Sequence, residues 1–253
     1  MKRVIIVQAR VHSTRLPGKV LLDLAGRPML ERQLERLKQC RAADDLIVAT
    51  TRHGDDRPIV SLAGRLGVRW FRGSSGDVLR RYVDAASQTQ ADVVVRITSD
   101  CPLIDPEVTD RVIRALCAEP AQCDYASNVV RRTFPRGLDT EAMFADTLLR
   151  IDRLAQLPHE REHVTIVPRS PRASLFLRRD VLDERDNSDL RWTVDAPADL
   201  AFVRELYQAL GLAEHVVPYA EMLAFVRARP ELSAINAAGH TWNPGDQLPR
   251  EAA

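Results

Sequence analysis

At 253 residues, the chain is long enough to bury a sizeable core and fits one large α/β domain or two small ones. Its content of 45% hydrophobic and 28% charged residues is ordinary for a soluble globular protein and argues against disorder or a fibrous class. The 36 Lys and Arg residues are balanced by 35 Asp and Glu, so the basic surplus typical of a nucleic-acid binder is missing and no nucleic-acid partner is expected.

The N-terminal segment predicts a cytoplasmic protein without a membrane anchor. Its apolar run, residues 4–7, is too short for a secretion signal or a membrane span. The cysteines, Cys40, Cys101, Cys117 and Cys123, form no C-x-x-C pair, and we expect reduced thiols that are partly buried.

The first half of the chain alternates between strand and helix patterns. Short apolar runs at 4–7, 46–49, 68–71 and 93–97 predict strands, and residues 29–37 and 58–66 each place leucine or isoleucine on one helical face. This rhythm predicts an α/β fold with a mostly parallel central sheet and helices on both faces. Ligands of such folds bind beyond the carboxyl ends of the strands.

The pattern changes at residue 124. We expect residues 124–180 to form a small mixed insertion that supplies a second substrate's pocket, with a helix around 145–157 and a strand at 174–179. A further strand is expected at 190–194 and two helices within 197–228. The sequence therefore predicts one domain, residues 1–228, followed by a loose tail, residues 229–253.

The loop after the first predicted strand carries the clearest chemical signal. The segment Ala9 to Lys19, ARVHSTRLPGK, holds the cations Arg10, Arg15 and Lys19 and a Pro-Gly turn, and backbone amides near Ser13 and Thr14 can donate hydrogen bonds. It lacks the glycine spacing of a Walker A loop. A solvated basic loop is the alternative, but three cations directly after a buried strand favour an anion site, which could hold a triphosphate.

Two carboxylates follow two later predicted strands. Asp100 comes after the apolar run 93–97, and Asp195 comes after 190–194. Mg²⁺ commonly takes one or two carboxylates together with phosphate oxygens, so the pair predicts a magnesium site. Asp195 could equally be the N-cap of a helix that begins near Pro197.

Two further segments carry polar side chains. Arg136, Asp139 and Glu141 form a cluster that could face an acceptor or lie in a surface turn. The string HEREH, residues 159–163, formally matches the H-E-x-x-H zinc pattern. No third ligand stands at a familiar spacing, so we favour helix residues near a pocket, with His163 a candidate for acceptor binding.

Taken together, these motifs resemble a known family. The strings ARVHSTRLPGKVL, FRGSSGDVLRRY, RITSDCPLID, PRGLDTE, EREHVT and RWTVDAPADL, within residues 3–210, resemble cytidylyltransferases that activate acidic sugars. The relatives are the spore coat polysaccharide biosynthesis protein F group and the 3-deoxy-manno-octulosonate and acylneuraminate cytidylyltransferases. One departure is Cys101-Pro102, where the octulosonate enzymes carry an acidic residue before the proline, so the acceptor cannot be carried over.

The resemblance implies a nucleotide-diphospho-sugar transferase-like, Rossmann-like fold, CTP as co-substrate, Mg²⁺ and a homodimer. It also implies roles for individual residues. Triphosphate contacts would come from Arg10, Ser13, Arg15 and Lys19 within the nucleotide loop that starts at Ala9; metal contacts would come from Asp100 and Asp195, and cytidine contacts from Arg72, Gly73, Ser74 and Asp77.

The expected reaction is transfer of CMP from CTP to a hydroxyl of an acidic sugar, a 2-keto-3-deoxy sugar acid, with release of pyrophosphate for surface polysaccharide biosynthesis. Arg15, Lys19, Asp100 and Asp195 would carry catalysis, and Arg136, Asp139, Glu141 and His163 would bind the acceptor. Positioning and charge neutralisation suffice for such chemistry. Three alternatives stay open: another nucleoside triphosphate or a non-sugar acceptor, a non-catalytic nucleotide-binding relative, and a zinc hydrolase.

Overall fold

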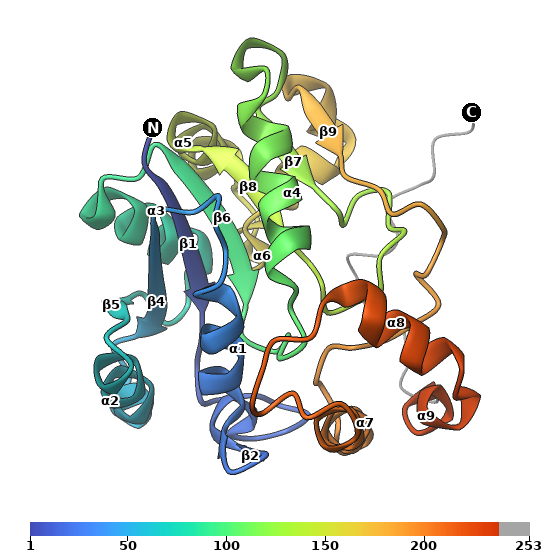
Figure 1. The fold of residues 1–253 in the computed structure, drawn as a ribbon. Helices are drawn as coiled ribbons and strands as arrows, with labels where there is room; N and C mark the ends of the chain where they lie inside the picture. Colours follow the sequence, from blue (N-terminus) through green and yellow to red (C-terminus); the bar gives the residue numbers. More distant parts are fainter. Residues whose placement is uncertain (238–253) are drawn as a thin grey trace.

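The computed structural model describes residues 1–237 and is built on one seven-stranded sheet (Figure 1). The strand order is β5-β4-β1-β6-β8-β7-β9, and only β8 runs against its neighbours within this sheet. The mostly parallel sheet that the sequence predicted is therefore confirmed. The strands are β1 (Arg3–Gln8), β4 (Asp45–Thr51), β5 (Arg69–Gly73), β6 (Val93–Thr98), β7 (Tyr125–Ser127), β8 (Glu141–Phe144) and β9 (Arg178–Asp180), and a hairpin of β2 (Asp23–Leu24) and β3 (Arg27–Pro28) stands apart.

Helices cover both faces of the sheet, because alternate side chains of each central strand point to opposite sides. In β1, Ile5 and Val7 join one apolar core, whereas Val4 and Ile6 join the other. The first core takes in α1 (Met29–Leu37), α2 (Arg57–Arg65), α4 (Pro106–Cys117), α7 (Pro197–Ala209) and α8 (Tyr219–Arg227). The second takes in α3 (Val78–Thr89) and α5 (Ala145–Leu154), and α6 (Pro158–His163) contacts α3.

The insertion extends the sheet beyond β6. Strand β8 pairs antiparallel with β6, with Glu141 opposite Arg96, and β7 and β9 complete the edge. The expected strand at 174–179 is a 3₁₀ turn, Pro171–Leu175, followed by the short strand β9. The chain after residue 124 thus forms a mixed extension of the sheet, in which β8 lies directly beside β6 and β7 lies between β8 and β9.

The strand expected at residues 190–194 does not form. Leu190, Trp192 and Val194 are buried as the apolar pattern required, yet the segment makes only an isolated bridge between Arg191 and Arg136. Its backbone bonds to the turn at 135–137 and to the loop after β6: Trp192 N donates to Arg136 O and Val194 N to Asp100 O. The segment is therefore attached to loops rather than to a neighbouring strand.

The expected loose tail is partly ordered. Pro230–Ala234 forms a short helix, α9, and Asn236 is 3% exposed, with its amide donating to Arg191 O at 2.9 Å and to Asp199 at 3.1 Å. The rest of the predicted tail, 238–253, lies outside the described residues. Within residues 1–237, no helix is long and apolar enough to span a bilayer.

Candidate active site

A cavity of about 1630 Å³ opens where β1 and β6 end and continues over the insertion. Its walls come from the loop after β1, the loop after β6, the turn around Arg136 and the segment 178–188. The predicted site residues that line it are Ala9, Arg10, Ser13, Arg15, Lys19, Asp100, Arg136, Asp139, Glu141, His163 and Asp195. Segments more than 180 residues apart in the chain thus meet at the carboxyl end of the parallel strands.

The loop Ala9–Lys19 is folded back on itself at its base. Gly18 N donates to Val11 O at 3.0 Å, and Val11 N donates to the buried carboxylate of Asp56 at 2.7 Å. Gly18 has a φ of +69°, a left-handed conformation that glycine adopts without strain. The closed base leaves Arg10 and Arg15 half exposed at the cavity, where they can meet an anion.

Lys19 joins the two predicted metal-binding carboxylates. Its ammonium group donates to Asp100 Oδ2 at 3.0 Å, to Asp195 Oδ1 at 2.9 Å and to Val194 O at 2.9 Å, so all three donors are used. Its side chain is 12% exposed. Burial favours the neutral amine, but the carboxylates outweigh burial and raise the pKa of Lys19 above its ordinary value.

Asp195 is not the N-cap of α7. Ala196 occupies that position, and Asp199 in the first turn accepts hydrogen bonds from the backbone amides of Asp195 and Ala196 at 2.9 Å each. The Asp195 carboxylate is instead shared by Lys19, Arg15 at 3.0 Å and Arg191 at 2.7 Å. Burial opposes its charge, but these cations, Lys19 foremost, hold the pKa of Asp195 below its ordinary value.

Sequence reasoning missed the residues that orient the two carboxylates. Thr98 Oγ1 donates to Asp100 Oδ1 at 2.6 Å, and Arg191 links Asp195 to Asp199, which is 1% exposed. The spacing of Asp199, three residues after the N-cap Ala196, was the available signal because an acidic residue there reaches back to the preceding amides.

Removing the Asp199 carboxylate is expected to destabilise the fold. In Asp199→Ala, buried Arg191 loses a partner and two backbone amides lose their acceptor, so we expect about 3–5 kcal/mol less free energy of unfolding. Urea denaturation measures this loss. Glu205→Ala, at an exposed position of the same helix, is the control and should change the value by less than about 0.5 kcal/mol. Equal stability of the two variants would contradict the structural role of Asp199.

The predicted acceptor cluster has a defined structure. Arg132 makes a bidentate pair with Asp139, at 2.6 and 2.9 Å, and Gly137 N also donates to Asp139. Burial works against the charge of Asp139, but Arg132 and Arg136 lower its pKa to about 2. Gly137 lies against the backbone of Trp192 and Thr193, where a Cβ atom would come within 2.5 Å, so the turn that carries Arg136 is fixed in place.

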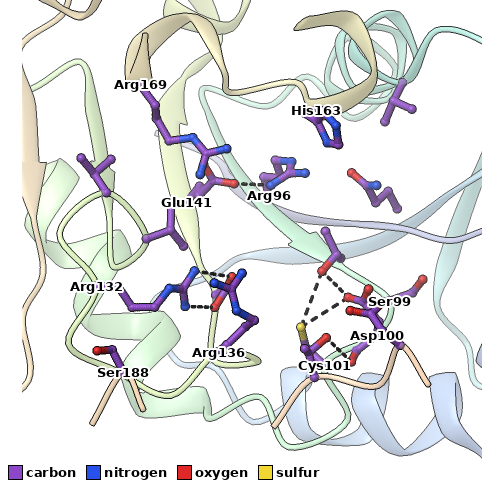
Figure 2. A pocket seen from close by; sticks show the side chains of 18 of the residues that line it. Arg96, Ser99, Asp100, Cys101, Arg132, Arg136, Glu141, His163, Arg169 and Ser188 are labelled. Carbon is purple, nitrogen blue, oxygen red and sulfur yellow. Dashed lines mark hydrogen bonds and ion pairs between the residues drawn. The ribbon is translucent and has the colours of Figure 1, made fainter. Parts of the chain in front are cut away.

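Near the Arg132–Asp139 pair, Glu141 is buried between cations (Figure 2). One of its carboxylate oxygens accepts from Arg96 and the other from the Tyr125 hydroxyl. Arg169 points toward Glu141 (Figure 2), and the positive charges of Arg96 and Arg169 overcome burial and lower the pKa of Glu141. Glu141 therefore holds Arg96 in place. For Glu141 to bond directly to the acceptor, Arg96 or Tyr125 would have to move.

His163 lies on the same wall as Arg96 and Arg169 (Figure 2). Partial burial, with the nearby positive charges of Arg96 and Arg169, lowers the pKa of its imidazole. A neutral ring can accept a hydrogen bond from a hydroxyl at neutral pH.

The residues expected near cytidine have partners within the fold. Arg72 donates to the backbone oxygens of Thr51 and His53, and Ser74 Oγ accepts from Asp77 N. Asp77 is the N-cap of α3 and pairs with Arg161 at 2.6 Å. Arg72, Gly73, Ser74 and Asp77 are not in the wall of the large cavity, whereas Val78 and Arg81 of α3 are. A cytidine role for the four stays a prediction.

The HEREH string does not form a zinc site. Glu160, which a zinc hydrolase would need as a base, is 3% exposed and accepts from the backbone amides of Gln156 and Leu157 and from Arg172. In residues 1–237, no group of three converging metal-ligating side chains includes His159 or His163. The string instead builds α6 and brings His163 to the pocket.

A family model described as cytidylyltransferase matches residues 4–221, which include the loop Ala9–Lys19 as well as Asp100 and Asp195. The chain belongs to the cytidylyltransferase family. It is 31% identical over 232 residues to the spore coat polysaccharide biosynthesis protein SpsF of Bacillus subtilis, covering 89% of this chain and 94% of that protein. The 3-deoxy-manno-octulosonate cytidylyltransferase of Geobacter sulfurreducens is 34% identical over 116 residues, 46% of each chain.

Solved structures agree with this assignment. A cytidylyltransferase from Leptospira borgpetersenii superposes with a TM-score of 0.87 at 32% identity, covering 92% of this chain and 97% of that one. The chain is thus a cytidylyltransferase, a CTP-dependent nucleotidyltransferase, and the predicted fold class and family are both confirmed.

Proposed function

We propose that this cytidylyltransferase transfers CMP from CTP to a hydroxyl of an acidic sugar, a 2-keto-3-deoxy sugar acid, and uses Mg²⁺. The observation that carries the proposal is the convergence of Asp100 and Asp195 on Lys19, at the base of a cation-bearing loop and at the edge of a cavity with an arginine-rich far wall. One half of the cavity suits a metal-bound triphosphate and the other half suits an anionic acceptor.

In the reaction, an acceptor oxygen attacks the α-phosphorus of CTP, the bond from that phosphorus to the bridging oxygen breaks, and pyrophosphate leaves. The hydroxyl proton passes to a base or to water. Arg10, Arg15 and Lys19 would neutralise the negative charge that accumulates on the departing phosphates. Most of the rate would come from positioning and charge neutralisation, because transfer of a phosphoryl group to an attacking oxygen needs little covalent chemistry from the protein.

The donor set of Asp100 and Asp195 fits a hard cation. Both carboxylates point at one position, which a cation, the Lys19 ammonium, already occupies. Oxygen ligands of this kind are those that Mg²⁺ prefers in proteins. A bound Mg²⁺ would polarise the α-phosphate and lower the pKa of the attacking hydroxyl.

Two clusters in the acceptor half of the cavity each have an excess of positive charge. Arg132 and Arg136 share the carboxylate of Asp139, and Arg96 and Arg169 share that of Glu141, so each group has one more cation than anion. A sugar acid, with a carboxylate beside several hydroxyls, fits this arrangement. The similarity to SpsF supports a product used for surface polysaccharide biosynthesis.

A pyrophosphate-release assay with CTP and a panel of 2-keto sugar acids tests the proposal. We expect at least one of the acids to support turnover in the presence of Mg²⁺ and none to do so with UTP in place of CTP. A thermal-shift comparison of CTP, UTP, ATP and GTP tests the nucleotide separately. Stabilisation by another triphosphate would favour a different nucleotide, and CTP binding without turnover on any acid would favour a non-sugar acceptor or a non-catalytic relative.

A homodimer and a cytoplasmic location stay predictions. Within residues 1–237, the insertion 124–180 is our candidate for a dimer contact, because it carries five of the eight large apolar side chains that are exposed. These five are Val130, Leu149, Leu157, Leu175 and Leu177. Light scattering on the purified protein measures the assembly directly.

A further inference from the structure

A second cluster of metal-ligating side chains lies outside the pair of carboxylates. His12 comes from the loop Ala9–Lys19, the proposed phosphate loop, whereas His53 and Asp55 come from the turn between β4 and α2. His12 Nε2 lies 2.9 Å from Asp55 Oδ2, and His53 Nδ1 lies 3.5 Å from the same oxygen. One ligand atom from each of the three residues lies within 4.8 Å of the other two, and this is the single group of its kind in residues 1–237.

We propose that His12, His53 and Asp55 form a binding site for a transition metal ion of the Zn²⁺ class. Two imidazoles and one carboxylate are a donor set that suits Zn²⁺ or Co²⁺, whereas Mg²⁺ prefers oxygen ligands throughout. The site would therefore select a different metal from Asp100 and Asp195. The three side chains are 64%, 54% and 57% exposed, so water can complete a four-coordinate shell.

The backbone that carries these ligands is held on both sides. Asp56, which is 1% exposed, accepts from Val11 N, next to His12, at 2.7 Å and from the Thr51 hydroxyl. His53 N donates to Thr51 Oγ1 at 3.1 Å, and its carbonyl accepts from Arg72 at 2.8 Å. The two loops are thus joined through Asp56 before any metal arrives, which lowers the entropy cost of bringing three ligands together.

The charge of Asp55 and the geometry of the two histidine rings also favour a cation between the three side chains. The two histidine rings meet edge to face with centroids 5.0 Å apart, and both approach one oxygen of Asp55. A metal ion between them would replace the direct contact of His12 with Asp55 and the long, 3.3 Å bond from Asp55 N to His53 Nδ1. Only weak contacts of exposed groups are lost in this exchange.

A metal ion bound at this site would link the phosphate loop to the turn after β4. His12 lies between Arg10 and Ser13 and is itself in the wall of the large cavity, whereas His53 and Asp55 are not. Metal bound here would restrain residues 11–14 at the mouth of the nucleotide pocket. We therefore expect slower amide hydrogen exchange in this segment when Zn²⁺ is bound.

Calorimetric titration of the full chain with ZnCl₂, after removal of any histidine tag and without nucleotide, tests the proposal. We expect one equivalent to bind, and His12→Ala and His53→Ala each to weaken that binding at least about tenfold, since loss of even an outer partner of a metal ligand has this effect. His215→Ala, at another exposed histidine, is the matched control and should bind as the parent does.

Two variants and one spectrum distinguish the proposed site from other residues of the chain that could bind zinc. Asp100→Asn should retain this zinc binding, so failure of the proposed magnesium site would not affect the result. A Co²⁺ complex should show nitrogen and oxygen ligation without a thiolate band. Unchanged zinc binding in both His12→Ala and His53→Ala, its loss in His159→Ala, or a thiolate band would each overturn the proposal.

Discussion

Asp100→Ala and Asp195→Ala are each expected to lower CTP-dependent pyrophosphate release by about 10³-fold or more. Each carboxylate holds one side of the proposed Mg²⁺ position, and the metal supplies several kcal/mol of stabilisation to the charge on the reacting phosphates. A loss of about 4 kcal/mol corresponds to about 10³ in rate. The rates are measured with saturating CTP and the best acceptor from the panel.

The two variants differ in their structural side effects. Asp195 is buried and paired with Lys19, Arg15 and Arg191, so its removal leaves charges without a partner, whereas the Asp100 side chain is 24% exposed. Asp195→Asn keeps the shape and should remain folded in thermal denaturation while still losing turnover. Asp23→Ala removes an exposed carboxylate that does not line the cavity and should keep the parent rate. Full activity in folded Asp100→Ala or Asp195→Asn would disprove the two-carboxylate metal site.

The parallel half of the fold could be predicted because its signals are local. Buried strands read as apolar runs, and the helices between them show leucine at helical spacing. The same criterion failed at 190–194, where the apolar alternation was correct but the hydrogen-bond partners were a turn and a loop. The alternation of apolar side chains indicates which residues are buried. It does not indicate which segment pairs with this backbone, because that depends on contacts between residues far apart in the chain.

The chemistry of the site could be predicted from residue types at strand ends, but the hydrogen bonds and ion pairs between its residues could not. Lys19 and Asp195 are 176 residues apart, and nothing in either segment indicates that they share a bond. The same limit applies to Glu141, expected to face the acceptor, whose two carboxylate oxygens bond to Arg96 and Tyr125. Arginine and carboxylate are equally suited to a ligand and to each other, and the choice depends on geometry that the sequence does not state.

The position of Lys19 has a consequence for metal binding. The Lys19 ammonium occupies the point on which Asp100 and Asp195 converge, so a metal ion binding to both carboxylates must displace it. Displacement is unfavourable alone, because Lys19 would lose three hydrogen bonds from a partly buried position. A triphosphate gives the displaced ammonium a new anionic partner, so metal and CTP should each strengthen the binding of the other.

Lys19→Met is therefore expected to have two opposite effects. Turnover should fall by about 10²-fold or more, because a charge that neutralises the departing phosphates is lost. Binding of Mn²⁺, a spectroscopic substitute for Mg²⁺, should become about tenfold to a hundredfold tighter without nucleotide, since charged hydrogen bonds worth about 1.5–3 kcal/mol no longer compete. Electron paramagnetic resonance titration measures this affinity, with Lys38→Met, at an exposed lysine on α1's C-cap, as the control. Weaker or unchanged Mn²⁺ binding in Lys19→Met would show that the ammonium does not occupy the metal position, because removal of a competing cation can only favour the metal.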